Sequence, residues 1–170
     1  FTRNQIWWKR FVPVIGWSAD SQIVVSAGSA TTPSLAATRS GRLHLVWRDN
    51  RDGNNEIYYK EYTPAGGWDL VDTRLTINSA SQIQPHLDAD PMDNVYVVWQ
   101  DNLEGNLNLR VYLARSTNGG KNFADPVDLS ANTFSDAANA AIAVDGDDVH
   151  VLWTFLGAGT GDIFHTQSQD

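Results

Sequence analysis

The chain has 170 residues, of which 42% are hydrophobic, so it can bury a substantial core within one domain. Its formal net charge of −8 argues against nucleic acid or an anionic membrane surface as the partner. The absence of cysteine excludes disulfides and thiolate chemistry, and no apolar run approaches the roughly 20 residues that a bilayer span needs.

Short apolar runs, rich in aromatic and β-branched residues, follow one another from the N-terminus and predict β-strands. The first run is 5–11, and the next are 33–37, 43–50 and 56–62. Residues 137–143 have the composition of a helix, but their place in the repeat described next favours a strand. The predicted fold class is therefore all-β.

These runs recur with a period of about 52 residues. The run 33–37 returns as 85–89, and the run 43–50 returns as 95–102, so that Trp47, Trp99 and Trp153 share one repeat position. Four antiparallel strands in a unit of about 40 to 55 residues are typical of a β-propeller blade. Such sheets bury both faces when they pack against one another around an axis. We therefore predict a β-propeller of four-stranded antiparallel blades.

The repeat divides the chain into units. We expect complete blades at 33–84 and 85–139, a half blade at 4–32 and a partial blade at 140–170. This is too little for a closed ring of the usual six or seven blades. An excerpt of a longer propeller is favoured, because a chain ending in mid-hairpin leaves a strand edge exposed. Completion of the ring by a second copy stays open as the alternative.

The tryptophans predict where the core lies. Trp47, Trp99 and Trp153 each end the most apolar strand of a unit, so we expect them between blades. Trp7 and Trp8 are adjacent and must face opposite sides of a strand, which places one of them at the surface. The exposed one is a candidate for stacking on a sugar ring or for an interface.

The stretch 116–123 predicts a tight corner between strands, because Asn118 tolerates left-handed backbone and the glycines carry no Cβ. Its residues Ser116, Asn118, Gly120 and Phe123 fit the pattern Ser-x-Asp-x-Gly-x-x-Trp, with Asn for Asp and Phe for Trp. The sequence therefore resembles the Asp-box, the bacterial neuraminidase repeat of sialidase-like propellers. Ser168 and Asp170 resemble the opening of another copy.

The resemblance implies a sialidase-like propeller in which Asp-boxes are structural corners on the face away from the active site. Sialidases use three arginines, a Tyr and Glu nucleophile pair and an Asp acid/base. The nearest match to their Arg-Ile-Pro motif is Arg10-Phe11-Val12-Pro13, which has one residue too many. The sequence therefore assigns no catalytic residue.

Polar loops between the second and third strands of each unit would lie on the opposite face, where propellers commonly bind ligands. Their carboxylates and amides suit sugar hydroxyls, and their hard oxygen ligands also suit calcium, although the spacing lacks that of an EF-hand. The simpler interpretation is that Asp, Asn and Gly make hairpin turns and bond local backbone. The candidate ligand-binding residues are Asp49, Arg51, Asp52, Asn54, Glu56, Asp101, Glu104, Asn106 and Asn108.

The histidines do not predict a metal site. His44 and His150 share a repeat position on separate blades, and His86 and His165 are isolated in the sequence. No cofactor is predicted. The leading hypothesis is a non-catalytic extracellular or cell-surface module that recognises a glycan or a protein. The alternatives are a segment of an exo-acting, sialidase-type glycoside hydrolase and a structural propeller within a larger assembly.

Overall fold

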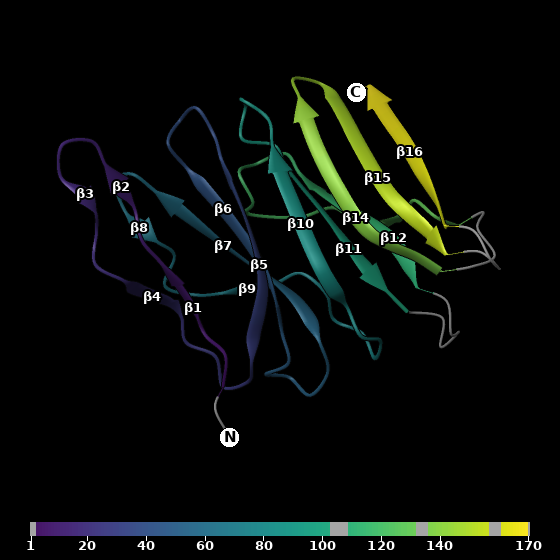
Figure 1. Ribbon diagram of the computed structural model, residues 1–170, viewed down its shortest axis with the longest axis horizontal. Helices are drawn as coiled ribbons and strands as arrows, with labels where there is room; N and C mark the ends of the chain where they lie inside the picture. Colours follow the sequence, from purple (N-terminus) through teal and green to yellow (C-terminus); the bar gives the residue numbers. More distant parts are fainter. Residues whose placement is uncertain (1–2, 103–108, 132–135, 157–160, 170) are drawn as a thin grey trace.

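The computed structural model describes residues 3–102, 109–131, 136–156 and 161–169, and no helix occurs in these ranges. In these ranges the strands alternate with turns and longer connections (Figure 1). They are β1 (Ile6–Trp8), β2 (Phe11–Val12), β3 (Gly16–Trp17), β4 (Ser21–Val24), β5 (Ala30–Ala37), β6 (Leu43–Asp49), β7 (Glu56–Thr63), β8 (Gly67–Trp68), β9 (Thr73–Arg74), β10 (Ile83–Ala89), β11 (Val95–Asp101), β12 (Arg110–Ser116), β13 (Val127–Asp128), β14 (Asp136–Asp145), β15 (Asp148–Leu156) and β16 (Gly161–Gln169).

The strands form successive antiparallel sheets, as the repeat predicts. We call β1 and β4 the N-terminal sheet, and the β2–β3 hairpin extends from it. The second sheet has the order β5-β6-β7-β8, with β9 also paired to β7, and the third has the order β10-β11-β12-β13. The fourth contains β14-β15-β16. The first strands β5, β10 and β14 lie side by side, so the sheets are arranged as neighbouring blades of a β-propeller (Figure 1).

The same register recurs in each of the last three sheets. Leu43 faces Tyr62, Val95 faces Ser116, and Val149 faces Ser168 across the second and third strands. Each repeat-related tryptophan is stacked on an aromatic ring of the neighbouring strand: the ring centroids are 5.8 Å apart for Trp47–Tyr58, 6.2 Å for Trp99–Tyr112 and 6.0 Å for Trp153–Phe164. The repeat therefore extends to individual side-chain pairs.

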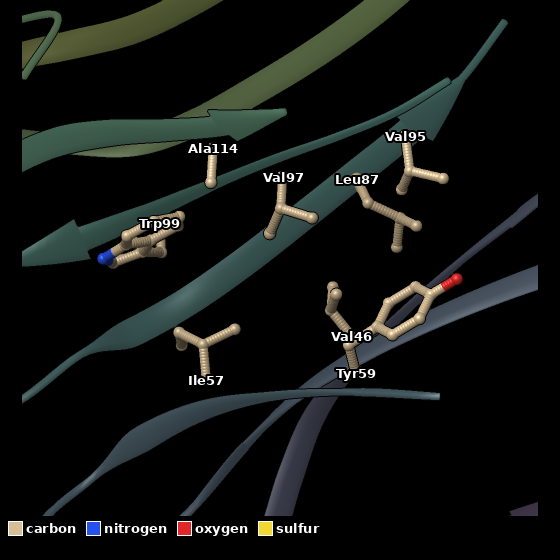
Figure 2. Close-up of a cluster of buried hydrophobic side chains, with 8 residues drawn as sticks. All are labelled: Val46, Ile57, Tyr59, Leu87, Val95, Val97, Trp99 and Ala114. Atoms are coloured by element: carbon tan, nitrogen blue, oxygen red, sulfur yellow. The ribbon is translucent and has the colours of Figure 1, made fainter. Parts of the chain in front are cut away.

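The core lies between sheets, which confirms the prediction for the tryptophans. Trp47, Trp99 and Trp153 are 0%, 1% and 5% exposed. Trp99 packs with Val46 and Ile57 of the preceding sheet (Figure 2). Trp47 and Trp153 lie in the clusters on either side of this one. Each sheet is thus fixed to its predecessor through a tryptophan on its second strand.

The two N-terminal tryptophans separate as predicted. Trp7 is 58% exposed. Trp8 packs against the next sheet, with ring centroids 5.5 Å from those of both Tyr62 and Trp68.

The corner after β12 is closed by side chains. Ser116 Oγ accepts a hydrogen bond from the Gly120 backbone N–H at 2.9 Å and donates to Asn118 Oδ1 at 2.9 Å. Asn118 Oδ1 also accepts from the Asn122 N–H at 3.0 Å. Phe123 packs edge-on against Tyr59, 5.2 Å between centroids. The corner of the third sheet therefore packs against the second sheet through Phe123.

The other predicted corner begins at Ser168, which lies in β16 at the register position of Ser116. Asp170 lies outside the described residues. The described part of the chain holds no helix with the length and apolarity that a membrane crossing requires.

Candidate functional site

Each of the first strands β5, β10 and β14 contains a bulge at the same place. The register shifts between Thr31 and Ser34 in β5, between Ile83 and His86 in β10, and between Ala138 and Ala141 in β14. In each case two residues of the first strand lie opposite one residue of the second, and that residue is the buried tryptophan. The bulge and the tryptophan opposite it therefore form one structural motif that is repeated in the three sheets.

The first bypassed residue of each bulge has left-handed backbone without being glycine. The φ angle is 50° at Thr32, 49° at Gln84 and 54° at Asn139. A β-branched residue such as Thr is a genuine outlier in this region, and each such residue costs on the order of 1 to 3 kcal/mol. Because the same backbone strain occurs at one position of three sheets, we attribute it to the fold and not to a single local sequence. Bulges redirect side chains and are common beside functional sites.

The bulges meet at a cavity of about 510 Å³ on the inner side of the three sheets. Thr32, Gln84 and Asn139 line it, and all three are exposed. The other lining residues are Pro33, Pro85, His86, Ala140 and Ala141. This axial pocket, as we name these eight residues, offers a hydroxyl, two amides and an imidazole, and none of its lining residues carries a carboxylate.

The second strands support the pocket from behind. Gln100, which is 2% exposed, donates a hydrogen bond through Nε2 to Gln84 Oε1. Arg48 donates through Nε to Thr31 Oγ1 at 3.0 Å. The buried Gln100 thus fixes the orientation of the exposed Gln84 side chain. Support of this kind pre-organises a binding group.

The predicted loop residues are largely occupied by the protein itself. Asp49 is 0% exposed and accepts hydrogen bonds from Ser26 Oγ at 2.7 Å, from the Arg51 backbone N–H at 3.0 Å and from the Arg51 guanidinium at 2.6 Å. Burial alone would raise the pKa of Asp49, but these hydrogen bonds and the charge of Arg51 together lower it. Arg51 also pairs with Asp72 at 2.7 Å. The first two candidates therefore brace one loop.

The remaining candidates of this loop are engaged in the same way. Glu56, also 0% exposed, accepts from Arg74 at 2.7 Å. Asp52 accepts from the Tyr58 hydroxyl, and Asn54 donates to the backbone carbonyl of Asn78 at 2.8 Å. These contacts agree with the simpler interpretation of the loop as a built turn. Ligand binding by its side chains stays a prediction.

The second predicted loop is only partly described. Asp101 is 2% exposed and accepts a hydrogen bond from Gln82 Nε2 at 3.1 Å. Glu104, Asn106 and Asn108 lie outside the described residues.

Two histidines that the sequence did not place together, His150 and His165, are in contact. His165, isolated in the sequence, has its Nε2 3.1 Å from Nδ1 of His150, with the rings inclined by 10°. His44 lies apart from this pair and bonds the Tyr59 hydroxyl at 2.7 Å. Within the described ranges, no three side chains of His, Cys, Asp or Glu come together in a way that could hold a metal ion.

Comparison with solved structures shows the fold that the chain shares with other proteins. An endo-arabinase from Bacteroides thetaiotaomicron superposes with a TM-score of 0.59 and 12% identity, over 99% of this chain and 76% of its own. A glycosyl hydrolase from Bacteroides ovatus gives 0.58 and 11%, over 95% of this chain and 51% of its own. A structure from the GH130 family of mannoside phosphorylases, a family that contains glycoside hydrolases targeting β-1,2 mannosidic linkages in Candida mannan, gives 0.56 and 10% over the same shares.

The chain thus spans about half the length of the last two proteins. No protein-family model and no curated protein matches the sequence. At these identities the likeness establishes the propeller fold of the chain, and it leaves the choice of site to the geometry described above.

Sequence reasoning missed the axial pocket. The returning Pro33 and Pro85 mark the first strands correctly, but a residue before proline normally takes an extended backbone. Thr32 and Gln84 therefore read as ordinary strand residues, and Asn139 precedes Ala140 instead of proline. Only the recurrence of a polar residue at this position was available as a signal.

Proposed function

We propose that this chain is part of a carbohydrate-binding propeller and that the glycan occupies the axial pocket. One observation carries the proposal: Thr32, Gln84 and Asn139 are strained, exposed polar residues that surround one cavity from three adjacent strands. The shared fold with glycoside hydrolases is consistent with a carbohydrate ligand.

The chemistry of the pocket suits sugar hydroxyls. A hydroxyl and two amides can both donate and accept hydrogen bonds, which matches the dual character of a sugar hydroxyl. Because the bulges are fixed by the fold, little conformational entropy is lost when a ligand binds. His86 adds a flat ring that can contact a sugar face. We place this recognition outside the cell or at its surface.

Binding without hydrolysis is favoured by the composition of the lining. Most glycoside hydrolases need two carboxyl groups beside the scissile bond, and the described lining contains none. The alternative, a segment of a glycoside hydrolase, takes its support from the fold of the similar structures. It requires acids from residues beyond this lining. The assignment of the corner at 116–123 as a sialidase-type Asp-box is a further part of the proposal, and as a structural corner it is compatible with either function.

The test is a glycan microarray followed by affinity electrophoresis in soluble polysaccharides. Gln84→Gly and Asn139→Gly remove an amide while keeping the left-handed backbone comfortable, so folding should be preserved. We expect each to weaken binding at least about tenfold, the equivalent of one lost hydrogen bond to a ligand.

Lys121→Ala serves as the matched control, because Lys121 is exposed in the corner at the opposite end of the third sheet. Equal binding by all variants, or no binding by the parent chain, would contradict the proposal. Release of reducing sugar from the same polysaccharides would favour the hydrolase alternative.

A further inference from the structure

One face of the fourth sheet is uncovered. The side chains of Val149, Val151 and Trp153 point toward the third sheet and are buried. The alternating side chains of β15 and β16 point the other way, and Leu152 and Ile163 are 43% and 78% exposed. We call His150, Leu152, Ile163 and His165 the forward face of the fourth sheet.

The same positions in the two preceding sheets are covered. Val46 and Ile57 of the second sheet are both 0% exposed beneath the third sheet. Val98 and Val111 of the third sheet are both 0% exposed beneath the fourth. The register makes these residues the counterparts of Leu152 and Ile163. In each covered case the second strand of the next sheet is a covering strand, together with residues of the first strand of that sheet.

That covering strand has a constant pattern. It presents Val95, Val97 and Trp99 to the second sheet, and Val149, Val151 and Trp153 to the third. A forward face is therefore matched by a strand that reads Val-x-Val-x-Trp, with the tryptophan opposite the bulge of its own sheet.

The polar end of the forward face follows the same rule. In the second sheet His44 bonds the Tyr59 hydroxyl at 2.7 Å, and Tyr59 reaches the Gly119 carbonyl in the corner of the next sheet at 3.3 Å. His150 and His165 take the places of His44 and Tyr59 and are 3.1 Å apart. The histidine pair therefore occupies the position that lies beneath the corner of the next sheet in the case of His44 and Tyr59.

We propose that the forward face of the fourth sheet binds a further propeller blade of the same repeat type. Its second strand reads Val-x-Val-x-Trp or a close variant and packs on Leu152 and Ile163. Its corner, of the kind formed by residues 116–123, covers the histidine pair. Burial of the two apolar side chains supplies the driving force.

A second copy of the described residues does not fit this role. Its three repeat-related tryptophans, Trp47, Trp99 and Trp153, are already covered by its own sheets. A shared blade is also blocked, because β16 pairs along the whole of β15, from Asp148–Gln169 to Leu156–Gly161. A partner's β1 would have to displace it. The blade therefore comes from polypeptide other than these described residues.

The test starts from the chain itself, which has no cysteine, so that one introduced thiol reports on one place. Ile163→Cys should react with a maleimide at nearly the rate of a free thiol, whereas Val111→Cys, its covered counterpart, should react at least about 100-fold more slowly. Light scattering should show no discrete dimer. A tight dimer that protects Ile163→Cys would make a second copy the occupant and overturn the proposal.

The second arm supplies the proposed partner by repeating residues 83–135 after position 170. In this extended chain we expect Ile163→Cys to become at least about 100-fold less reactive. Ile163→Asp should lower the melting temperature of the extended chain and leave that of the original chain unchanged. A folded extension that leaves the thiol reactive would contradict the proposal. So would an extension that stays unfolded by hydrogen exchange while the original sheets remain protected.

Discussion

The hydroxyl of Tyr59 donates a hydrogen bond to the carbonyl oxygen of Gly119, 3.3 Å away, and so joins the core of the second sheet to the corner of the third. His44 Nδ1 is hydrogen-bonded to the same hydroxyl at 2.7 Å. Burial raises the pKa of Tyr59 well above its usual value, so the hydroxyl keeps its proton. The contact depends on how closely the corner approaches the tyrosine ring.

Gly120→Ala should be strongly destabilising, because a Cβ at this position would lie 1.8 Å from the Tyr59 hydroxyl oxygen. Gly67→Ala is the matched control: its φ of 76° resembles the 83° of Gly120, but nothing lies within 4 Å of its Cβ. We expect the control to lose about 1 kcal/mol from backbone strain and Gly120→Ala to lose at least about 2 kcal/mol more. Urea unfolding measures both, and equal losses would show that the corner can move away from Tyr59.

Asn118→Asp should be neutral or stabilising, although it changes the charge. The Oδ1 atom of Asn118 accepts hydrogen bonds from Ser116 and Asn122, and a carboxylate accepts both at least as well. Asn118→Ala, which removes the acceptor, should cost about 1 kcal/mol. Thermal unfolding distinguishes the two variants. A loss from Asn118→Asp as large as that from Asn118→Ala would count against the Asp-box interpretation of the corner.

Stability should fall in mild acid because of His44. Burial lowers the pKa of this fully buried imidazole, with the charge of Arg42 acting in the same sense and that of Asp93 opposing it. Below the unfolded-state pKa of about 6.5 the unfolded chain binds a proton that the folded chain does not. The stabilisation is therefore complete above that pH and is lost as pH falls toward the folded-state pKa.

The slope from this one group can reach about 1.4 kcal/mol per pH unit. His44→Phe should reduce the dependence of the melting temperature on pH in this range, at some cost in stability at neutral pH. His86→Asn, at an exposed position, should leave the dependence unchanged. A parent chain whose stability does not change between about pH 7 and pH 5 would rule out the buried neutral histidine.

Thr32→Gly should not destabilise the fold, although it deletes a side chain from a strand. Glycine adopts the φ of 50° without strain, which offsets its greater loss of backbone entropy on folding. We expect a change between zero and a gain of about 1 kcal/mol, together with weaker glycan binding. Thr31→Gly is the control, because Thr31 precedes the bulge and is paired with Arg48 in regular strand pairing. It should destabilise the fold by about 1 kcal/mol. A loss from Thr32→Gly equal to that of the control would show that the bulge is not strained.

The propeller fold follows from the sequence because its signal is repeated. Trp47, Trp99 and Trp153 each end an apolar strand, and burial between sheets is the arrangement that satisfies all three. The spacing of the corner glycines from Ser116 likewise specifies a turn that the side chains then close. The turn-forming residues and the 52-residue repeat indicate the same arrangement of strands, so the propeller fold could be predicted from the sequence.

The site could not be reached in this way. In the sequence, Asp49 has the character of a polar loop residue. In the structure it is buried and bonded to Arg51 of its own loop and to Ser26 of the connection between β4 and β5. Gln84 reads as a strand residue, and its left-handed backbone results from the pairing of β10 with β11. In both cases the decisive interaction is set by tertiary structure.

The placement of one tryptophan at each sheet boundary has a consequence for how the chain unfolds. Among the described residues, the main contacts between sheets join adjacent sheets. The free energy of unfolding is therefore approximately a sum of sheet terms and nearest-neighbour coupling terms, as in a one-dimensional array. Trp99 carries much of the coupling between the second and third sheets. Its removal would divide a single cooperative transition into two, one for each side of the lost boundary.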